Sequence, residues 1–184
     1  MKRIDTPVAG IVLLEPTVHG DARGHFFEAF HRDRFAELGL PTDFVQTNVS
    51  RSQRGVLRGL HFQQPKAQGK LVYVLEGAVY DVGVDIRHGS PQAGRWFGAE
   101  LSADNHRMMY IPPGFAHGFV VLSDYATFVY QCTETYERSC DRGIAWNDPD
   151  FDVRWPVEAP LLSDKDARAP RWRDLAPESL PEYA

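Results

Sequence analysis

The feature that most constrains this fold is the segment from Lys70 to Arg87, in which side-chain character alternates at period two. Such alternation is typical of a β-strand, where successive side chains point to opposite faces of a sheet. One face of its second half is apolar and consists of Ala78, Tyr80, Val82, Val84 and Ile86. Glu76-Gly77 interrupts the alternation and predicts the tight turn of a hairpin.

Further short β-rich runs are bounded by Gly, Pro, Asn or Asp, which favour turns. They cover residues 10–14, 25–30, 44–50, 56–63, 96–101, 107–111, 118–122 and 126–133. One short helix is predicted at residues 31–38, where Phe35 and Leu38 are three apart and Gly39 follows. Many short strands at close spacing predict a single all-β domain, a sandwich or a barrel.

Composition excludes several classes of protein. Among 184 residues, 43% are apolar and 24% charged, which is ordinary for a globular chain and not for a disordered one. The net charge of −5 argues against a general nucleic-acid or membrane-surface binder. No apolar stretch approaches the ~20 residues of a membrane-spanning helix, and the first residues lack the apolar core of a secretory signal. We therefore expect a cytoplasmic protein.

Two cysteines, Cys132 and Cys140, form neither a C-x-x-C pair nor a disulfide framework. Neither has a basic neighbour that would activate the thiol, and no G-x-S-x-G is present. The absence of a Walker A loop and of G-x-G-x-x-G leaves nucleotide hydrolysis and nicotinamide chemistry without support. Past residue 147 the chain becomes rich in Pro, Asp and Arg, which predicts an irregular tail anchored by Trp155 and Trp172.

Two histidines lie in unusual surroundings: His61 in VLRGLHFQ and His117 in IPPGFAHGF. A single histidine among apolar residues is often a hydrogen-bonded core residue, but two beside glycines at strand edges favour a shared pocket. The turn before His117 is typical of cupin jelly rolls, whose metal-binding members pair His-x-His with a later carboxylate. Here Gln63 and Lys70 occupy those places, and an amide and an ammonium make a poor site for a divalent cation.

Proton transfer is a better match to these residues. A histidine such as His61, a carboxylate that orients it and a phenol acting as acid would suit removal of a proton next to a carbonyl. General acid–base catalysis supplies roughly 10²–10⁴-fold, so a cation at the enolate oxygen is also needed, and it contributes about 3–4 kcal/mol. Lys70 could be that cation, although its spacing also suits an exposed charge at a strand edge.

Eight motifs, in order and with compatible spacing from about residue 10 to 170, make the chain similar to the dTDP-4-dehydrorhamnose 3,5-epimerase family. They are GDARGHFFEAF (20–30), VLRGLHFQ (56–63), QGKL (68–71), DVGVDIR (81–87), IPPGFAHGFVVLSD (111–124), FVYQCTETY (128–136), WNDPD (146–150) and LSDKD (162–166).

The resemblance implies a cupin-type jelly-roll barrel with short peripheral helices, in one domain spanning residues 1–184. The core would cover residues 10–150, and the extension 151–184 would pack on it and supply Asp166. The implied activity needs no cofactor or metal: dTDP-4-dehydro-6-deoxy-D-glucose is inverted at C3 and C5 to dTDP-4-dehydro-L-rhamnose, a step toward cell-surface polysaccharide. A homodimer formed by strand exchange is also implied, with no nucleic-acid or membrane partner.

The resemblance also implies roles for residues. His61 would be the base, Asp166 its orienting carboxylate, Tyr130 the acid and Lys70 the cation at the C4 oxyanion. Substrate would be bound by Arg23, Phe26, Glu28, Gln46, Asn48, Arg58, His117, Tyr136 and Lys165. Arginine grips pyrophosphate well, and aromatic rings stack on thymine. From the residues alone, Tyr136 could instead be a core or interface aromatic, and Arg23 could cap the turn at Gly24.

Three alternatives remain open at this stage. Related enzymes that invert only C3 or only C5 share nearly all these motifs. A metal-dependent cupin enzyme and a catalytically inactive sugar-nucleotide-binding cupin are the others. The main departure from the family pattern is Tyr73, where arginine is common, and a change there could alter a contact at the substrate's edge.

Overall fold

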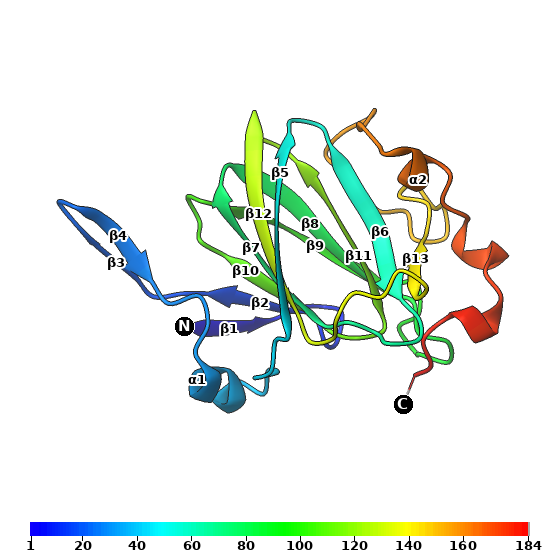
Figure 1. Ribbon diagram of the computed structural model, residues 1–184, viewed down its shortest axis with the longest axis horizontal. Coiled ribbons are helices and arrows are strands. Elements are labelled where there is room, and N and C mark those ends of the chain that lie inside the picture. Colours follow the sequence, from blue (N-terminus) through cyan, green and yellow to red (C-terminus); the bar gives the residue numbers. More distant parts are fainter. Residues whose placement is uncertain (184) are drawn as a thin grey trace.

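The computed structural model describes residues 1–183, and its body consists of two antiparallel sheets that face each other (Figure 1). One sheet has six strands in the order β1-β2-β10-β7-β12-β5. These strands are β1 (Lys2–Asp5), β2 (Val12–Glu15), β10 (Met108–Ile111), β7 (Lys70–Glu76), β12 (Tyr125–Cys132) and β5 (Gln46–Gln53). The other sheet has five strands in the order β13-β6-β11-β8-β9. They are β13 (Asp141–Gly143), β6 (Leu57–Gln63), β11 (Phe115–Val121), β8 (Ala78–Asp85) and β9 (Trp96–Ser102).

The interior between the sheets holds an apolar cluster toward one end and a cavity toward the other. Val72, Val79, Phe119 and Phe128 belong to that cluster, and each is at most 4% exposed. Burial of this kind stabilises the fold by about 25 cal/mol per Å² of apolar surface. The polar residues that share these strands with the cluster therefore lie on a rigid support.

Both sheets are also covered on part of their outer faces. Helix α1 (Arg32–Glu37) packs Phe35 against the six-stranded sheet beside Leu14 and Leu71. The C-terminal segment covers the five-stranded sheet, where Val82 meets Trp155 and Trp172 in one cluster. This second layer explains why both faces of β8 are buried, although period-two alternation by itself does not show which faces are covered.

The C-terminal segment follows an ordered course along the body (Figure 1). It forms α2 (Asp164–Ala167) and two 3₁₀ turns, η1 (Trp172–Asp174) and η2 (Pro177–Ser179). Its end is held at His88, whose N–H donates to Pro181 O at 2.7 Å and whose carbonyl accepts from Tyr183 N at 3.0 Å. The segment predicted as an irregular tail anchored by Trp155 and Trp172 does pack on the body, with both rings against the cluster of the five-stranded sheet.

A two-stranded arm, β3 (Val18–Asp21) and β4 (Gly24–Phe27), projects from the body (Figure 1). Within the arm, the ring of His25 lies 4.6 Å from that of His106 and is stacked with Phe27, their centroids 6.1 Å apart. The outer part of the arm is exposed, and Phe26 at 69% is the most exposed large apolar side chain that the structure describes. An isolated two-stranded ribbon with an exposed aromatic tip is a surface that favours association.

The structure confirms the predicted all-β jelly roll and the helix at residues 31–38. The predicted hairpin at Glu76-Gly77 is wrong, because β7 and β8 belong to different sheets and do not pair; Gly77, with φ of +78°, instead turns the chain from one sheet to the other. The short strands β1, β3 and β13 and the helix α2 were not predicted, because segments of three or four residues carry little periodic signal. Tyr73 lies on the outer face of β7 with the α1 cluster, so the prediction of a contact at the substrate's edge is not supported within this chain. Within residues 1–183, no helix is long and apolar enough to cross a membrane.

Candidate active site

A polar cavity lies between the two sheets, where β5, β6, β7 and β12 approach one another. It consists of two adjoining hollows of about 360 and 180 Å³. Both are lined by His61, Lys70 and Tyr130, which therefore face one shared space. The larger hollow opens toward Tyr136 and the smaller one ends at His117. A cavity that gathers several titratable groups is a candidate catalytic site.

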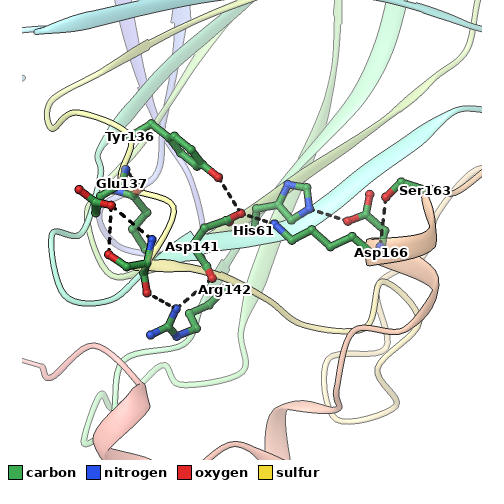
Figure 2. A network of polar contacts seen from close by, with 10 residues as sticks. His61, Tyr136, Glu137, Asp141, Arg142, Ser163 and Asp166 are labelled. Carbon is green, nitrogen blue, oxygen red and sulfur yellow. Dashed lines mark hydrogen bonds and ion pairs between the residues drawn. The ribbon is translucent and has the colours of Figure 1, made fainter.

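His61 is oriented by Asp166 (Figure 2). Its Nε2 lies 2.6 Å from Oδ1 of Asp166, which is 5% exposed and sits in α2. Ser163 caps this helix by accepting the N–H of Asp166 at 3.1 Å. Burial opposes the charge on Asp166, but hydrogen bonds from His61 and Ser163 outweigh it and lower the pKa of the carboxyl. An ionised Asp166 fixes the Nε2–H tautomer of His61, which leaves Nδ1 as the basic nitrogen.

Lys70 and Tyr130 come from the paired strands β7 and β12. Lys70 pairs with Cys132, and Tyr130 is two residues from Cys132 on β12. The side chains of Lys70 and Tyr130 therefore lie on the same inner face of the sheet. Burial lowers the pKa of Lys70 and raises that of Tyr130. Burial thus disfavours the charged form of the lysine and leaves it poorly hydrated, whereas the tyrosine keeps its proton at neutral pH.

The deep end of the cavity contains a second imidazole–carboxylate pair. His117, 7% exposed, places Nε2 2.9 Å from Oδ2 of Asp81, which is fully buried. Burial lowers the pKa of His117, and the nearby carboxylate opposes this shift. Asp81 was not predicted as a site residue, although a carboxylate within an apolar strand needs a partner when it is buried.

The two histidines face each other because β6 and β11 approach very closely. Residues 61 and 117 are directly paired across the two strands. Gly59 has φ of +131°, and a Cβ there would lie 2.6 Å from the Cα of Gly118. Only glycine permits that backbone conformation and that separation at the same time.

Polar side chains surround the mouth of the larger hollow (Figure 2). Asp141 on β13 accepts a hydrogen bond from Tyr136 Oη at 3.2 Å and forms an ion pair with Lys165. Gln46 and Asn48 project from β5 and are bonded to each other at 3.0 Å. Because Lys165 and Asp166 are consecutive in α2, this short helix contacts both the mouth of the cavity, through Lys165, and the imidazole of His61, through Asp166.

The predicted site residues fall into two groups in space. The cavity is lined by His61, Lys70, Tyr130, Gln46, Asn48, Arg58, His117, Tyr136 and Lys165, while Asp166 contacts it through His61. Arg23, Phe26 and Glu28 instead line separate hollows on the arm. Arg23 is bonded to Asp21 of the same turn, and Glu28 to Arg34 of α1. The roles of all these residues stay predictions.

Gln63 occupies the place of the second histidine in a metal-binding cupin. Its amide is engaged by the backbone of two neighbouring loops, with Nε2 donating to Lys66 O at 2.9 Å. Across residues 1–183, no three His, Cys, Asp or Glu side chains are grouped so that they could hold a metal ion.

An oriented imidazole, a protonated phenol and a lysine amine in one jelly-roll cavity are the groups of a proton-transferring isomerase. The family model described as dTDP-4-dehydrorhamnose 3,5-epimerase matches residues 5–174. The chain belongs to this family and is an isomerase.

Individual relatives agree with this assignment. The chain is 52% identical over 176 residues to the dTDP-4-dehydrorhamnose 3,5-epimerase of Pseudomonas aeruginosa, covering 95% of this chain and 97% of that protein. The crystal structure of dTDP-6-deoxy-D-glucose-3,5-epimerase from Legionella pneumophila in complex with dTDP-4-keto-L-rhamnose has a TM-score of 0.97 and 48% identity, covering 100% and 98%. A 3'-monoepimerase from Streptomyces bikiniensis, in complex with dTDP-quinovose, has a TM-score of 0.89 and 36% identity, covering 97% and 92%.

Proposed function

We propose that this enzyme converts dTDP-4-dehydro-6-deoxy-D-glucose to dTDP-4-dehydro-L-rhamnose by inverting C3 and C5. The observation that carries the proposal is the shared cavity, in which His61, Lys70 and Tyr130 meet. C3 and C5 both flank the C4 ketone, so a single site for the enolate oxygen serves both inversions. The identity of 52% to a 3,5-epimerase and 36% to a 3'-monoepimerase favours the double inversion.

In this mechanism, Nδ1 of His61 removes the proton from C3 or C5. The electron pair left on carbon moves into the C4 carbonyl and forms an enolate, whose oxygen the ammonium of Lys70 stabilises. Asp166 stabilises the imidazolium that forms, because its carboxylate accepts the Nε2–H. Tyr130 then delivers its phenolic proton to the opposite face of the same carbon, which completes the inversion.

The nucleotide part would extend toward the mouth, where Tyr136 and Lys165 lie. The charge of Lys165 suits the pyrophosphate and the ring of Tyr136 suits thymine, and an arginine such as Arg23 would also suit the pyrophosphate. Arg23 and Phe26 are on the projecting arm and not at this mouth. We therefore propose a homodimer in which each arm reaches the cavity of the other chain.

A cytoplasmic location is consistent with this proposal. The activated sugar nucleotide is an intracellular type of metabolite, and Cys132 and Cys140 are free thiols in the structure.

The test is incubation of the enzyme with dTDP-4-dehydro-6-deoxy-D-glucose in D₂O, followed by NMR. We expect deuterium at both C3 and C5 together with formation of the L-configured product. Deuterium at one carbon only would identify a mono-epimerase, and no incorporation at either would exclude this function. His61→Asn serves as the control, since its amide is polar but has no nitrogen basic enough to remove the proton.

Replacing Tyr130 with Phe separates acid from base. We expect the variant to retain exchange at C3 and C5 while inversion is reduced by roughly 10²-fold or more, since only proton delivery is lost. Equal loss of exchange and inversion would contradict the role of Tyr130 as the acid.

A further inference from the structure

The loop between β12 and β13, residues 133–140, carries Tyr136 over the mouth of the cavity. Its two ends are held by backbone hydrogen bonds: Thr133 N donates to Gly69 O at 2.9 Å, and Gln64 N donates to Cys140 O at 2.9 Å. Tyr136 itself is 53% exposed and touches the rim through the bond of its hydroxyl to Asp141. Burial of the tyrosine ring therefore does not fix the loop.

The middle of the loop is held by glutamine side chains. Four consecutive residues, 134 to 137, each give one backbone group to a glutamine. The four bonds are Gln68 Nε2 to Glu134 O at 2.8 Å, Gln63 Nε2 to Thr135 O at 3.2 Å, Tyr136 N to Gln46 Oε1 at 2.8 Å and Glu137 N to Gln63 Oε1 at 2.7 Å. All three glutamines line the larger hollow.

Gln63 is the central member of this group. It is 4% exposed and contacts the loop on both sides of Tyr136, through Thr135 O and Glu137 N. Its Nε2 also donates to Lys66 O at 2.9 Å, so one amide joins two loops at the rim. A buried amide with both its donor and its acceptor satisfied defines one loop position, because any displacement leaves polar groups unpaired.

We propose that Gln63 is a positioning residue, which holds the loop of Tyr136 in the position that receives the nucleotide part of the substrate. Gln63 follows His61 by two residues on β6, so the strand that supplies the catalytic base also positions the loop at the mouth of the cavity. Gln46 and Gln68 support the same loop from β5 and from the segment before β7. This inference rests on the proposed function, since it takes the bound molecule to be a dTDP-sugar.

The first test is Gln63→Met, which keeps the length of the side chain and removes its hydrogen bonds. We expect the Kd of dTDP and the KM of the sugar nucleotide to rise by roughly tenfold, while kcat changes less than about twofold. Gln53→Met is the matched control, because Gln53 is exposed at the far end of β5 and outside the larger hollow. A fall in kcat with unchanged KM would overturn the proposal.

A double-mutant cycle tests whether Gln63 acts through Tyr136. On a Tyr136→Ala background, Gln63→Met should change the Kd of dTDP by less than about twofold, because the ring that the loop positions is gone. Independent, additive effects of the two substitutions would overturn the proposal. Hydrogen–deuterium exchange should accelerate in residues 133–140 of Gln63→Met and stay unchanged in β7 and β12.

If Gln63→Met does not fold, Gln68→Met is the second variant, because it removes only the bond to Glu134 O. We expect a smaller rise in the same Kd, and an unchanged Kd would overturn the proposal. Failure of the proposed function can be distinguished from failure of this inference, since in the first case the wild-type enzyme would exchange no proton of the sugar. Failure of this inference alone would leave that exchange intact with unaltered dTDP binding in the variants.

Discussion

At the scale of single residues, the pairing of His61 with Asp166 is the contact on which the chemistry depends. The 2.6 Å separation and the depressed pKa of Asp166 mean that the carboxylate stays charged at neutral pH. This charge both selects the tautomer of His61 and stabilises the imidazolium.

Replacing Asp166 with Asn removes that charge and leaves an oxygen that still accepts the Nε2–H. We expect exchange at C3 to slow by roughly 10²-fold or more, with little change in the Kd of dTDP. The measurement is deuterium incorporation at saturating substrate. Asp164→Asn in the same helix is the control, because Asp164 is exposed and pairs only with Arg168. Equal effects of the two substitutions would contradict the role of Asp166.

The environment of Lys70 predicts the alkaline limit of activity. Burial lowers the pKa of this ammonium from its ordinary value of 10.5, whereas burial raises that of Tyr130. Because burial moves the two pKa values in opposite directions, we assign the alkaline limit to the loss of the charge of Lys70, with which enolate stabilisation fails. We expect exchange by Tyr130→Phe to keep the wild-type alkaline limb, with a midpoint below 10.5. Disappearance of this limb in Tyr130→Phe would assign it to the tyrosine instead.

At the scale of elements, the contact of β6 with β11 positions both histidines. Gly59→Ala would place a Cβ 2.6 Å from the Cα of Gly118 and 2.8 Å from the carbonyl oxygen of His117. We expect a loss of stability of about 1–3 kcal/mol or more, since backbone atoms cannot move aside as a side chain can. Thermal unfolding measures it.

The control for this substitution is Gly55→Ala. Gly55 has φ of +79° but no atom within 4 Å of its Cβ position, so it reports the cost of the backbone conformation alone. An equal loss of stability in the two variants would show that the close approach of the strands is unimportant.

The sequence predicts the strands better than it predicts the coverings of the sheets. The alternation of residues 70–87 identifies β7 and β8, because one strand's period is a local property. It does not show that the two strands belong to different sheets, so the predicted hairpin between them is wrong. The course of the C-terminal segment depends instead on contacts between distant residues, such as the edge-on packing of the Trp155 ring against Tyr80. No local pattern encodes such contacts.

The candidate site shows the same division. His61, Lys70 and Tyr130 could be found from their motifs, and the structure places them in one cavity. Gln46 was predicted as a substrate-binding residue, whereas Asp81, Gln63 and Gln68 were not predicted as site residues. Buried amides that bond to backbone carry no motif, because any backbone group can accept or donate to them. Their function becomes visible only in the folded arrangement.

At the scale of the whole molecule, the arm predicts cooperation between two chains. Mixing a His61→Asn chain with an Arg23→Ala, Phe26→Ala chain, each inactive by itself, should restore activity. Random reassociation would give about a quarter of the wild-type sites, because half of the dimers carry one intact site. Sedimentation should show dimers throughout. No recovery in verified mixed dimers would mean that each arm serves its own chain.

The cavity has a floor built from strands and an entrance built from loops. Lys70 and Tyr130 belong to paired strands within a close-packed sheet, whereas Tyr136 and Lys165 belong to segments held by side chains. Sequence drift in such segments leaves the sheet undisturbed. Related proteins can therefore evolve specificity for another activated sugar through changes at the entrance of the cavity, while the residues that carry out the chemical step are conserved.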